Sequence, residues 1–149
     1  MREILFKAKR IDNGEWVEGH LFDNGFDGKE KRYFVGTFII EKYNGTACDK
    51  WNATGIYFYE IDPKTLCQFT GLTDKNGKRI WENDILMAHL DESYPEDTTY
   101  ETVEWGIAGW VTHEANSADR QYLDEFDLEH FEVVGNIFDN KELLQEERK

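Results

Sequence analysis

The first part of the chain alternates hydrophobic and polar positions, as the strands of a half-buried sheet do. Residues 4–9 place apolar side chains on one side and charged ones on the other. Asn13-Gly14 follows and predicts a two-residue hairpin turn, because both central positions of such a turn need positive φ. Residues 15–22 then return as a second strand with Trp16 and Phe22 on one face. The pattern predicts an N-terminal β-hairpin.

Segments rich in β-branched and aromatic residues predict further strands along the chain. We expect residues 32–40 to form a largely buried strand, followed by strands at 55–62, 84–90, 101–105, 109–114 and 131–138. Residues 41–54 form a longer connection that has the composition of a small ribbon. About seven strands with one or two short helices predict a mainly β fold of antiparallel strands with a barrel-like portion.

Helical signals are few. Asp62-Pro63 predicts one helical turn, with Asp62 as its N-cap and Pro63 at its first position. The stretch 116–130 fits either helical spacing or an irregular loop, and residues 139–149 predict one short capped helix. Residues 91–100 are expected to form a very acidic loop.

The length of 149 residues indicates a single domain over 1–149, with lobes at 1–62 and 63–149 as a subdivision. No apolar run approaches the roughly 20 residues that span a bilayer. The segment "MREILFKAKR" has charge and alternation where a signal peptide has an apolar core, so we expect a cytoplasmic protein. Exposed strand edges would allow pairing into a homo-oligomer.

Charge is distributed unevenly. Residues 1–81 carry 13 Lys/Arg and 12 Asp/Glu, whereas residues 82–149 carry 4 Lys/Arg and 19 Asp/Glu, which places the net charge of −14 in the second half. Such a surface repels nucleic acid and anionic lipid and attracts basic proteins or cations. Simple solubility would also explain it.

The stretch "CQFTGLTDKNGKRIWENDIL", residues 67–86, raises the question of a phosphate or calcium site. Five residues separate Gly71 from Gly77, one more than a P-loop has, and Arg79 stands where Ser or Thr would hold Mg²⁺. A calcium loop would require an acidic ligand at its twelfth position, where Ile85 stands. With both sites excluded, the segment is interpreted as a turn at "DKNG", in which Asn76 and Gly77 can adopt left-handed conformations.

The segment "DPKTLCQFTGLTDKNGKRIWENDIL" resembles the central motif of the YopX family of phage and prophage proteins, and the two ends of the chain resemble the ends of that family. The matching positions are Gln68, Phe69, Thr70, Gly71, Leu72, Asp74, Asn76, Gly77, Ile80, Trp81, Glu82, Asp84 and Ile85. Trp81 replaces a commoner tyrosine, and Asn83 replaces a commoner glycine. Residues 23–55 match nothing comparable.

The resemblance implies a mainly β fold with a barrel-like portion and no established activity, so it supplies no catalytic residue. The motif has a structural interpretation. Gly71 and Gly77 would allow the backbone conformations of turns, Ile80, Trp81 and Ile85 would pack in the core, and Asp74 and Glu82 would stabilise turns. No cofactor is implied.

Candidate chemistry is sparse. The histidines, His20, His89, His113 and His130, share no ligand spacing, although folding could bring two of them beside acidic residues. Cys48 and Cys67 have no partner motif and are expected to be reduced structural residues, with a nucleophilic Cys–His pair as a minor alternative. Glu82 and Asp84 would share one face of a strand, as paired acids or as turn residues.

Three functions follow from these patterns. The first is a non-enzymatic phage or prophage accessory protein that binds another protein, one of basic character, through an acidic C-terminal surface. The alternative is a nucleic-acid module that uses the N-terminal basic set and exposed rings. The basic set is Lys7, Lys9, Arg10, Lys29, Lys31 and Arg32, and the candidate rings are Trp16, Trp51, Trp81, Trp105, Trp110 and Tyr57-Phe58-Tyr59. A metal-dependent enzyme is the third.

Overall fold

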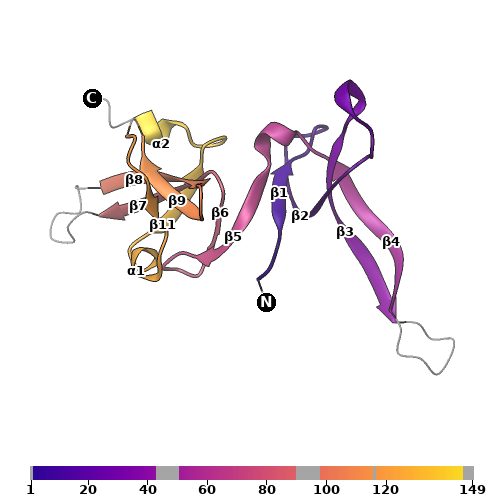
Figure 1. Cartoon of the computed structure of the whole chain (residues 1–149), viewed down its shortest axis with the longest axis horizontal. Coiled ribbons are helices and arrows are strands. Elements are labelled where there is room, and N and C mark those ends of the chain that lie inside the picture. Colours follow the sequence, from indigo (N-terminus) through magenta and orange to yellow (C-terminus); the bar gives the residue numbers. More distant parts are fainter. Residues whose placement is uncertain (1, 43–50, 90–97, 116, 146–149) are drawn as a thin grey trace. The chain divides into compact units, whose positions relative to one another are not determined.

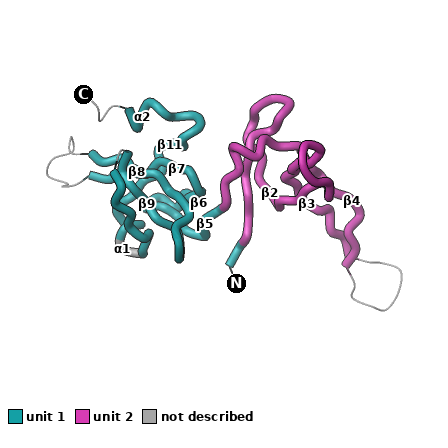
Figure 2. The backbone as a smooth tube through the Cα atoms, turned by 45° about the horizontal axis from the view of Figure 1, so that its top comes forward, with its two compact units in different colours: residues 1–3, 69–149 teal, residues 4–68 magenta. Residues whose placement is uncertain are grey.

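The protein is described from a computed structural model over residues 2–42, 51–89, 98–115 and 117–145. It consists of antiparallel strands with a few short helical turns (Figure 1). The strands separate into two compact units, residues 4–68 and residues 1–3 with 69–149, which Figure 2 colours separately. We call them the N-terminal unit and the C-terminal unit. The mainly antiparallel β class expected from the sequence is confirmed. Over the described residues, no helix has the length and hydropathy of a membrane span.

The elements of the N-terminal unit are β1 (Phe6–Lys9), β2 (Trp16–Asp23), η1 (Gly28–Glu30), β3 (Tyr33–Lys42), β4 (Trp51–Glu60) and η2 (Pro63–Thr65). Strand β5 (Cys67–Thr73) crosses the boundary between the units. The C-terminal unit continues with β6 (Arg79–Trp81), β7 (Asp84–His89), β8 (Thr98–Trp105), β9 (Trp110–Glu114), β10 (Gln121–Tyr122), α1 (Glu125–Leu128), β11 (Glu132–Asn136) and α2 (Glu142–Gln145).

In the N-terminal unit the strands form a meander in the order β4-β3-β2-β1, and Phe6 of β1 pairs with Gln68 of β5. Its core contains the buried side chains of Ala8, Val35 and Ile61. An isolated bridge joins Arg10 to Ile61, so the sheet curls until its first and last strands meet at one end. This bridge is the nearest approach to the expected barrel, and no closed barrel forms among the described strands.

The C-terminal unit contains a five-stranded sheet in the order β10-β9-β8-β7-β11. The pair β5–β6 begins this unit, with Phe69 opposite Trp81. The core cluster consists of Ile80, Leu86, Val103, Trp110, Phe131 and Val133. Alternation along β8 turns Glu101 and Val103 to one face of the sheet and Thr102 to the other.

Two predictions about the N-terminal strands are wrong. The hairpin at Asn13-Gly14 exists, but its turn spans Ile11–Gly14, closed by Arg10 N–H donating to the Glu15 carbonyl at 2.9 Å. Gly14 has a φ of 73°, while Asn13 keeps a negative φ, so this is not the two-residue turn.

Strand β3 is also less buried than expected, since Phe38 and Ile40 are about half exposed. The reason is that β2 pairs only with Tyr33–Gly36, so the rest of β3 has β4 as its single neighbour among the described strands. Strand β4 begins at Trp51 rather than at residue 55, which extends this two-stranded ribbon. The central part of the 41–54 connection, residues 43–50, lies outside the described residues.

The remaining predictions had mixed outcomes. Asp62 caps η2 as expected, accepting from Lys64 N–H at 3.0 Å with Pro63 at the first position. The ambiguous stretch 116–130 contains both β10 and the single turn α1. The expected C-terminal helix is α2, although only to Gln145 within the described residues. Most of the predicted acidic loop, residues 91–97, lies outside them, and residues 98–100 belong to β8.

Candidate functional site

The motif residues of 67–86 form one continuous piece of backbone: β5, a turn, β6, a second turn and the start of β7. Gly71 and Gly77 have φ values of 86° and 80°, whereas Asn76 does not enter the left-handed region. The motif residues that are buried are Phe69, Thr70, Asp74, Ile80, Trp81, Asp84 and Ile85. Gln68, Leu72 and Glu82 are half-buried, and Asn76 is exposed.

Asp74 is the polar centre of this segment. Its Oδ1 accepts from the N–H groups of Asn76 and Lys78 at 2.8 and 2.9 Å, and its Oδ2 accepts from Val133 N–H at 2.9 Å. Burial by itself would raise the pKa of Asp74, but these three backbone donors, with the Lys78 charge, outweigh it, and the pKa is lowered. The carboxylate therefore holds the turn and ties it to β11.

Glu82 and Asp84 do not form a pair of acids on one strand. Glu82 lies in the turn before β7, while the buried Asp84 accepts from Trp81 N–H at 2.8 Å through its Oδ2. Between them, Asn83 has a φ of 71° and is the one non-glycine residue with positive φ among those described. A glycine adopts that conformation without strain.

The N-terminal basic set is divided among several local partners. Arg10 pairs with Asp12 at 2.6 Å, and its guanidinium lies 4.1 Å from the centre of the Tyr59 ring. Lys7 and Lys9 lie over Trp16, with their Nζ atoms 4.8 and 5.4 Å from the ring centre.

At the other end of the set, Lys31 lies 3.6 Å from Asp23, and Arg32 donates to the carbonyls of Lys29 and Lys31. The basic residues therefore do not converge on one site.

Of the candidate rings, Trp81 and Trp110 are buried, and Trp16 is half-buried. Trp51, Trp105 and the run Tyr57-Phe58-Tyr59 are exposed. Phe58 also belongs to a cluster with Phe22 and Phe34, whose ring centres are 5.5–5.9 Å apart. Exposed rings are therefore concentrated on the β3–β4 ribbon.

The histidines are not brought together. His113 Nε2 lies 2.9 Å from the Thr102 hydroxyl and its Nδ1 lies 3.0 Å from the Glu114 carbonyl, while His89 Nδ1 lies 3.2 Å from the Thr98 hydroxyl. His20 and His130 are exposed. Within the described part of the chain, no three His, Cys, Asp or Glu side chains are placed to hold a metal ion.

Cys67 is buried, and its thiol Sγ donates to the Thr65 carbonyl at 3.2 Å. Cys48 lies outside the described residues.

The structure does bring acidic residues together in the C-terminal unit. A pocket of about 260 Å³ opens between β8, β9 and residues 117–121. It is lined by Thr99, Glu101, Thr112, His113, Glu114, Ser117, Asp119 and Gln121. Three of these residues are carboxylates, and none of the described lysines or arginines lines it. We call this site the acidic pocket.

Glu101 is the half-buried carboxylate of the acidic pocket. It stands opposite Glu114 in the β8–β9 ladder, and the Thr112 hydroxyl donates to its Oε1 at 3.1 Å. Burial raises the pKa of Glu101, and the nearby charges of Glu114 and Asp127 raise it further. A cation in the pocket would relieve this repulsion.

Arg120 follows Asp119 in sequence, but its guanidinium is directed to other acceptors. It donates to the Glu104 carboxylate and to the Ser117 carbonyl, the latter at 3.0 Å. Arg120 lines a separate cavity of about 400 Å³ with Ile107 and Tyr122. The nearest arginine in sequence therefore does not occupy the acidic pocket.

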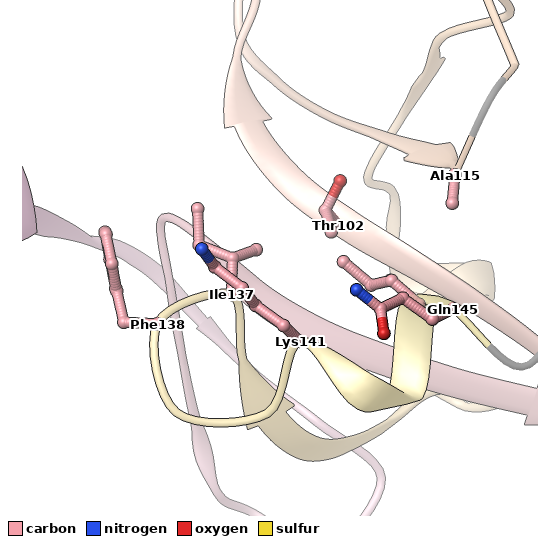
Figure 3. A pocket seen from close by; sticks show the side chains of 7 residues that line it. Thr102, Ala115, Ile137, Phe138, Lys141 and Gln145 are labelled. Carbon is pink, nitrogen blue, oxygen red and sulfur yellow. The ribbon is translucent and has the colours of Figure 1, made fainter.

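A second, mostly apolar pocket of about 480 Å³ lies beside α2. Figure 3 shows its side chains gathered between strand β8 and the segment that leads into α2. Its lining residues are Thr102, Ala115, Ile137, Phe138, Lys141, Leu144 and Gln145. Because Thr102 and Glu101 are neighbours on one strand, the two pockets lie on opposite faces of the sheet.

Sequence reasoning did not single out Glu101, Glu114 or Asp119. The only signal was the excess of acidic residues after residue 81, which marks a region and not a site. The cross-strand pairing of Glu101 with Glu114 depends on the β8–β9 register, which charge composition does not predict.

Comparisons with known proteins agree with the motif. The family model described as YopX protein matches residues 6–145. The crystal structure of protein EF1440 from Enterococcus faecalis is similar in fold, with a TM-score of 0.62 and 20% sequence identity, covering 97% of this chain and 99% of that one. No curated protein matches the chain. Because the family match spans nearly the whole sequence, the chain belongs to the YopX family.

Proposed function

We propose that this protein is a non-enzymatic binding module whose acidic pocket takes a lysine or arginine side chain of a partner protein. The observation that carries the proposal is the convergence of Glu101, Glu114 and Asp119 on one hollow that none of the described lysines or arginines lines. Carboxylates bind guanidinium and ammonium groups through charge-assisted hydrogen bonds.

The charge of the whole unit supports the same partner chemistry. Residues 1–3 and 69–149 contain 8 Lys/Arg against 21 Asp/Glu, a net charge of −13, whereas residues 4–68 contain 9 against 10, a net charge of −1. A field of that sign attracts a basic partner and speeds its association, and it is weakened by salt. The half-buried position of Glu101 adds specificity, because a contact made there excludes water.

The nucleic-acid alternative has less support. Arg10 and Lys31 pair with acidic neighbours, and the N-terminal unit as a whole is nearly neutral. Lys7 and Lys9 over Trp16 are the best remaining elements of such a site. A mobility-shift assay at low salt with single-stranded DNA would detect it. We further propose, from family membership, that the protein is a phage or prophage accessory protein acting in the host cytoplasm.

A titration of the ¹⁵N-labelled protein with short lysine- and arginine-containing peptides, followed by NMR, tests the chemistry of the pocket. We expect the amide signals of Glu101, Thr112 and Gln121 to shift, and a peptide of glutamines to have no effect. Affinity for the basic peptide should fall by roughly tenfold in Glu101→Gln, since a hydrogen bond to a charged group contributes about 1.5–3 kcal/mol.

A control of equal charge separates the pocket from the general field. Glu129 and Glu142 are exposed acids of the same unit that do not line the acidic pocket. Glu129→Gln with Glu142→Gln should leave most of the affinity, whereas Glu101→Gln with Glu114→Gln should abolish it. Equal loss in both double variants would refute a pocket and leave only non-specific attraction.

A further inference from the structure

A pocket of about 440 Å³ opens in the N-terminal unit, where β3 begins and β4 ends. All of its lining residues belong to that unit, so we call it the N-terminal pocket. Its apolar wall consists of Ile11, Tyr33, Ile61 and Pro63. Ile11 is 57% exposed, so an apolar side chain is accessible to a ligand there. Hollows of a few hundred Å³ with apolar walls and a few polar groups are the usual binding sites of small molecules.

Arg32 lines this pocket with two donors that have no acceptor. Its Nη1 donates to the carbonyls of Lys29 and Lys31 at 2.8 and 3.0 Å, which holds the guanidinium against its own loop. Its Nε and Nη2 donate to no group among the described residues. These two atoms form the edge of a guanidinium that binds a planar carboxylate through parallel hydrogen bonds. A carboxylate is therefore the group that fits the remaining donors of Arg32.

The loop that carries Arg32 is fixed by its own hydrogen bonds. Asn24 Nδ2 donates to the Glu30 carbonyl at 2.9 Å, and Asn24 Oδ1 accepts from Arg32 N–H at 3.2 Å. The Asn24 N–H in turn donates to the Arg32 carbonyl at 3.2 Å. A group that is already positioned loses less conformational freedom when a ligand binds, which favours affinity.

Glu60 brings the opposite charge to the same pocket. No ion pair joins it to Lys31 or Arg32 within the described part of the chain, whereas Lys31 lies 3.6 Å from Asp23. The pocket therefore offers one unpaired cation and one unpaired carboxylate beside an apolar wall. A ligand with both charges matches this pair. The net charge of −14 also repels a purely anionic ligand but has little effect on one of zero net charge.

We propose that the N-terminal pocket binds a free α-amino acid with a large apolar side chain. The carboxylate of the ligand lies on the Nε–Nη2 edge of Arg32, and its ammonium group lies beside the Glu60 carboxylate. Because a single carbon joins these two groups, the amino acid bridges two protein side chains that do not pair directly. Its side chain packs on the apolar wall, where Tyr33 favours an aromatic ring.

Titration of the ¹⁵N-labelled full chain with phenylalanine, followed by NMR, tests the proposal. We expect the amide signals of Ile11, Arg32 and Ile61 to shift. Glycine lacks the apolar side chain and should bind at least roughly tenfold more weakly. No shift up to about 10 mM phenylalanine, several times the dissociation constant of roughly 2 mM expected for a ligand of this size, would overturn the proposal.

Two analogues assign the ends of the ligand to the two protein side chains. Phenethylamine lacks the carboxylate, and 3-phenylpropanoate lacks the ammonium group. Arg32→Gln should weaken phenylalanine and 3-phenylpropanoate by roughly tenfold and leave phenethylamine unchanged, because it removes charge-assisted hydrogen bonds to the carboxylate alone. Glu60→Gln should weaken phenylalanine and phenethylamine and leave 3-phenylpropanoate unchanged. The analogue that keeps its affinity also shows that each variant is folded.

Lys29→Gln and Glu30→Gln are the matched controls, since both residues are exposed on the same loop and do not line the pocket. They should leave all three affinities within about twofold, because exposed charges contribute little to a contact they do not make. Equal loss of all three ligands in Arg32→Gln would indicate a disturbed loop and overturn the assignment of the carboxylate. Binding of 3-phenylpropanoate as tight as that of phenylalanine would overturn the role of Glu60 and with it the choice of an amino acid.

Discussion

The Oδ2 atom of Asp74 accepts a hydrogen bond from the N–H of Val133 at 2.9 Å, across 59 positions of sequence. Asp74 lies in the turn between β5 and β6, and Val133 lies on β11 at the edge of the five-stranded sheet. This buried carboxylate thus adds a side-chain link between the family motif and the last strand, beside the backbone ladder that pairs β11 with β7. The other carboxylate oxygen organises the turn itself.

Replacing Asp74 with alanine should lower the free energy of unfolding by about 3 kcal/mol or more. The change leaves three backbone N–H groups without an acceptor, and each unsatisfied buried donor costs about 1–3 kcal/mol. Urea denaturation measures the difference. Asp119→Ala, at an exposed position, is the control and should change stability by less than about 0.5 kcal/mol. Equal stability of Asp74→Ala and the wild type would contradict the assigned role.

The same contact predicts an acid dependence. Because the folded protein lowers the pKa of Asp74, its contribution is present above the ordinary carboxyl pKa and is lost as pH falls through that pKa and then the lowered one. The stability difference between wild type and Asp74→Asn should therefore be largest at neutral pH and shrink in acid. Denaturation curves at pH 7 and at pH 3 compare the two. A stability difference that grows in acid would mean that folding raises the pKa of Asp74, which would contradict the prediction.

Asn83 makes a separate prediction about the backbone. Its φ of 71° is a left-handed conformation, and its N–H donates to the Val103 carbonyl at 2.8 Å. Asn83→Gly should keep stability within about 0.5 kcal/mol, because relief of strain offsets greater freedom in the unfolded chain. Asn83→Val should lower it by about 1–2 kcal/mol. Thermal unfolding of the two variants decides this, and a stable valine variant would argue against the left-handed backbone.

The sequence predicted the features that depend on residues close together in the chain, and it did not predict those that depend on the pairing of distant strands. Alternation and turn residues predicted most strands and the cap at Asp62, because these patterns act between near neighbours. The exposure of Phe38 and the partner of Asp74 were not predictable in this way. Both depend on which distant strands pair with each other. The ladder of β3 with β2, for example, ends at Gly36 and leaves Phe38 beyond it.

The acidic pocket could not be predicted from the sequence for the same reason. Charge composition identified the acidic half of the chain, but only the β8–β9 register places Glu101 opposite Glu114. The family motif, by contrast, was recognisable without structure because its residues lie in one segment of 67–86.

Glu101→Gln should stabilise the folded protein at neutral pH. Burial and the neighbouring carboxylates raise the pKa of Glu101, so the protonated form is favoured in the folded state. Its favourable contribution is full below the ordinary carboxyl pKa and is lost as pH rises through the raised one. The glutamine variant should therefore unfold at a higher temperature than wild type at pH 7 and at nearly the same temperature at pH 4. A less stable variant at pH 7 would contradict the described electrostatics.

The acidic pocket is the central claim, and affinity capture from a bacterial lysate tests it most directly. Wild-type protein, the Glu101→Gln/Glu114→Gln variant and the Glu129→Gln/Glu142→Gln variant would be compared at roughly 0.1 M salt and again near 0.5 M, where exposed charges are largely screened. We predict one basic protein that is retained by the wild type and by the second variant, is lost from the pocket variant, and weakens at high salt. Retention of the same partner by the pocket variant, or its loss from both variants alike, would contradict the account.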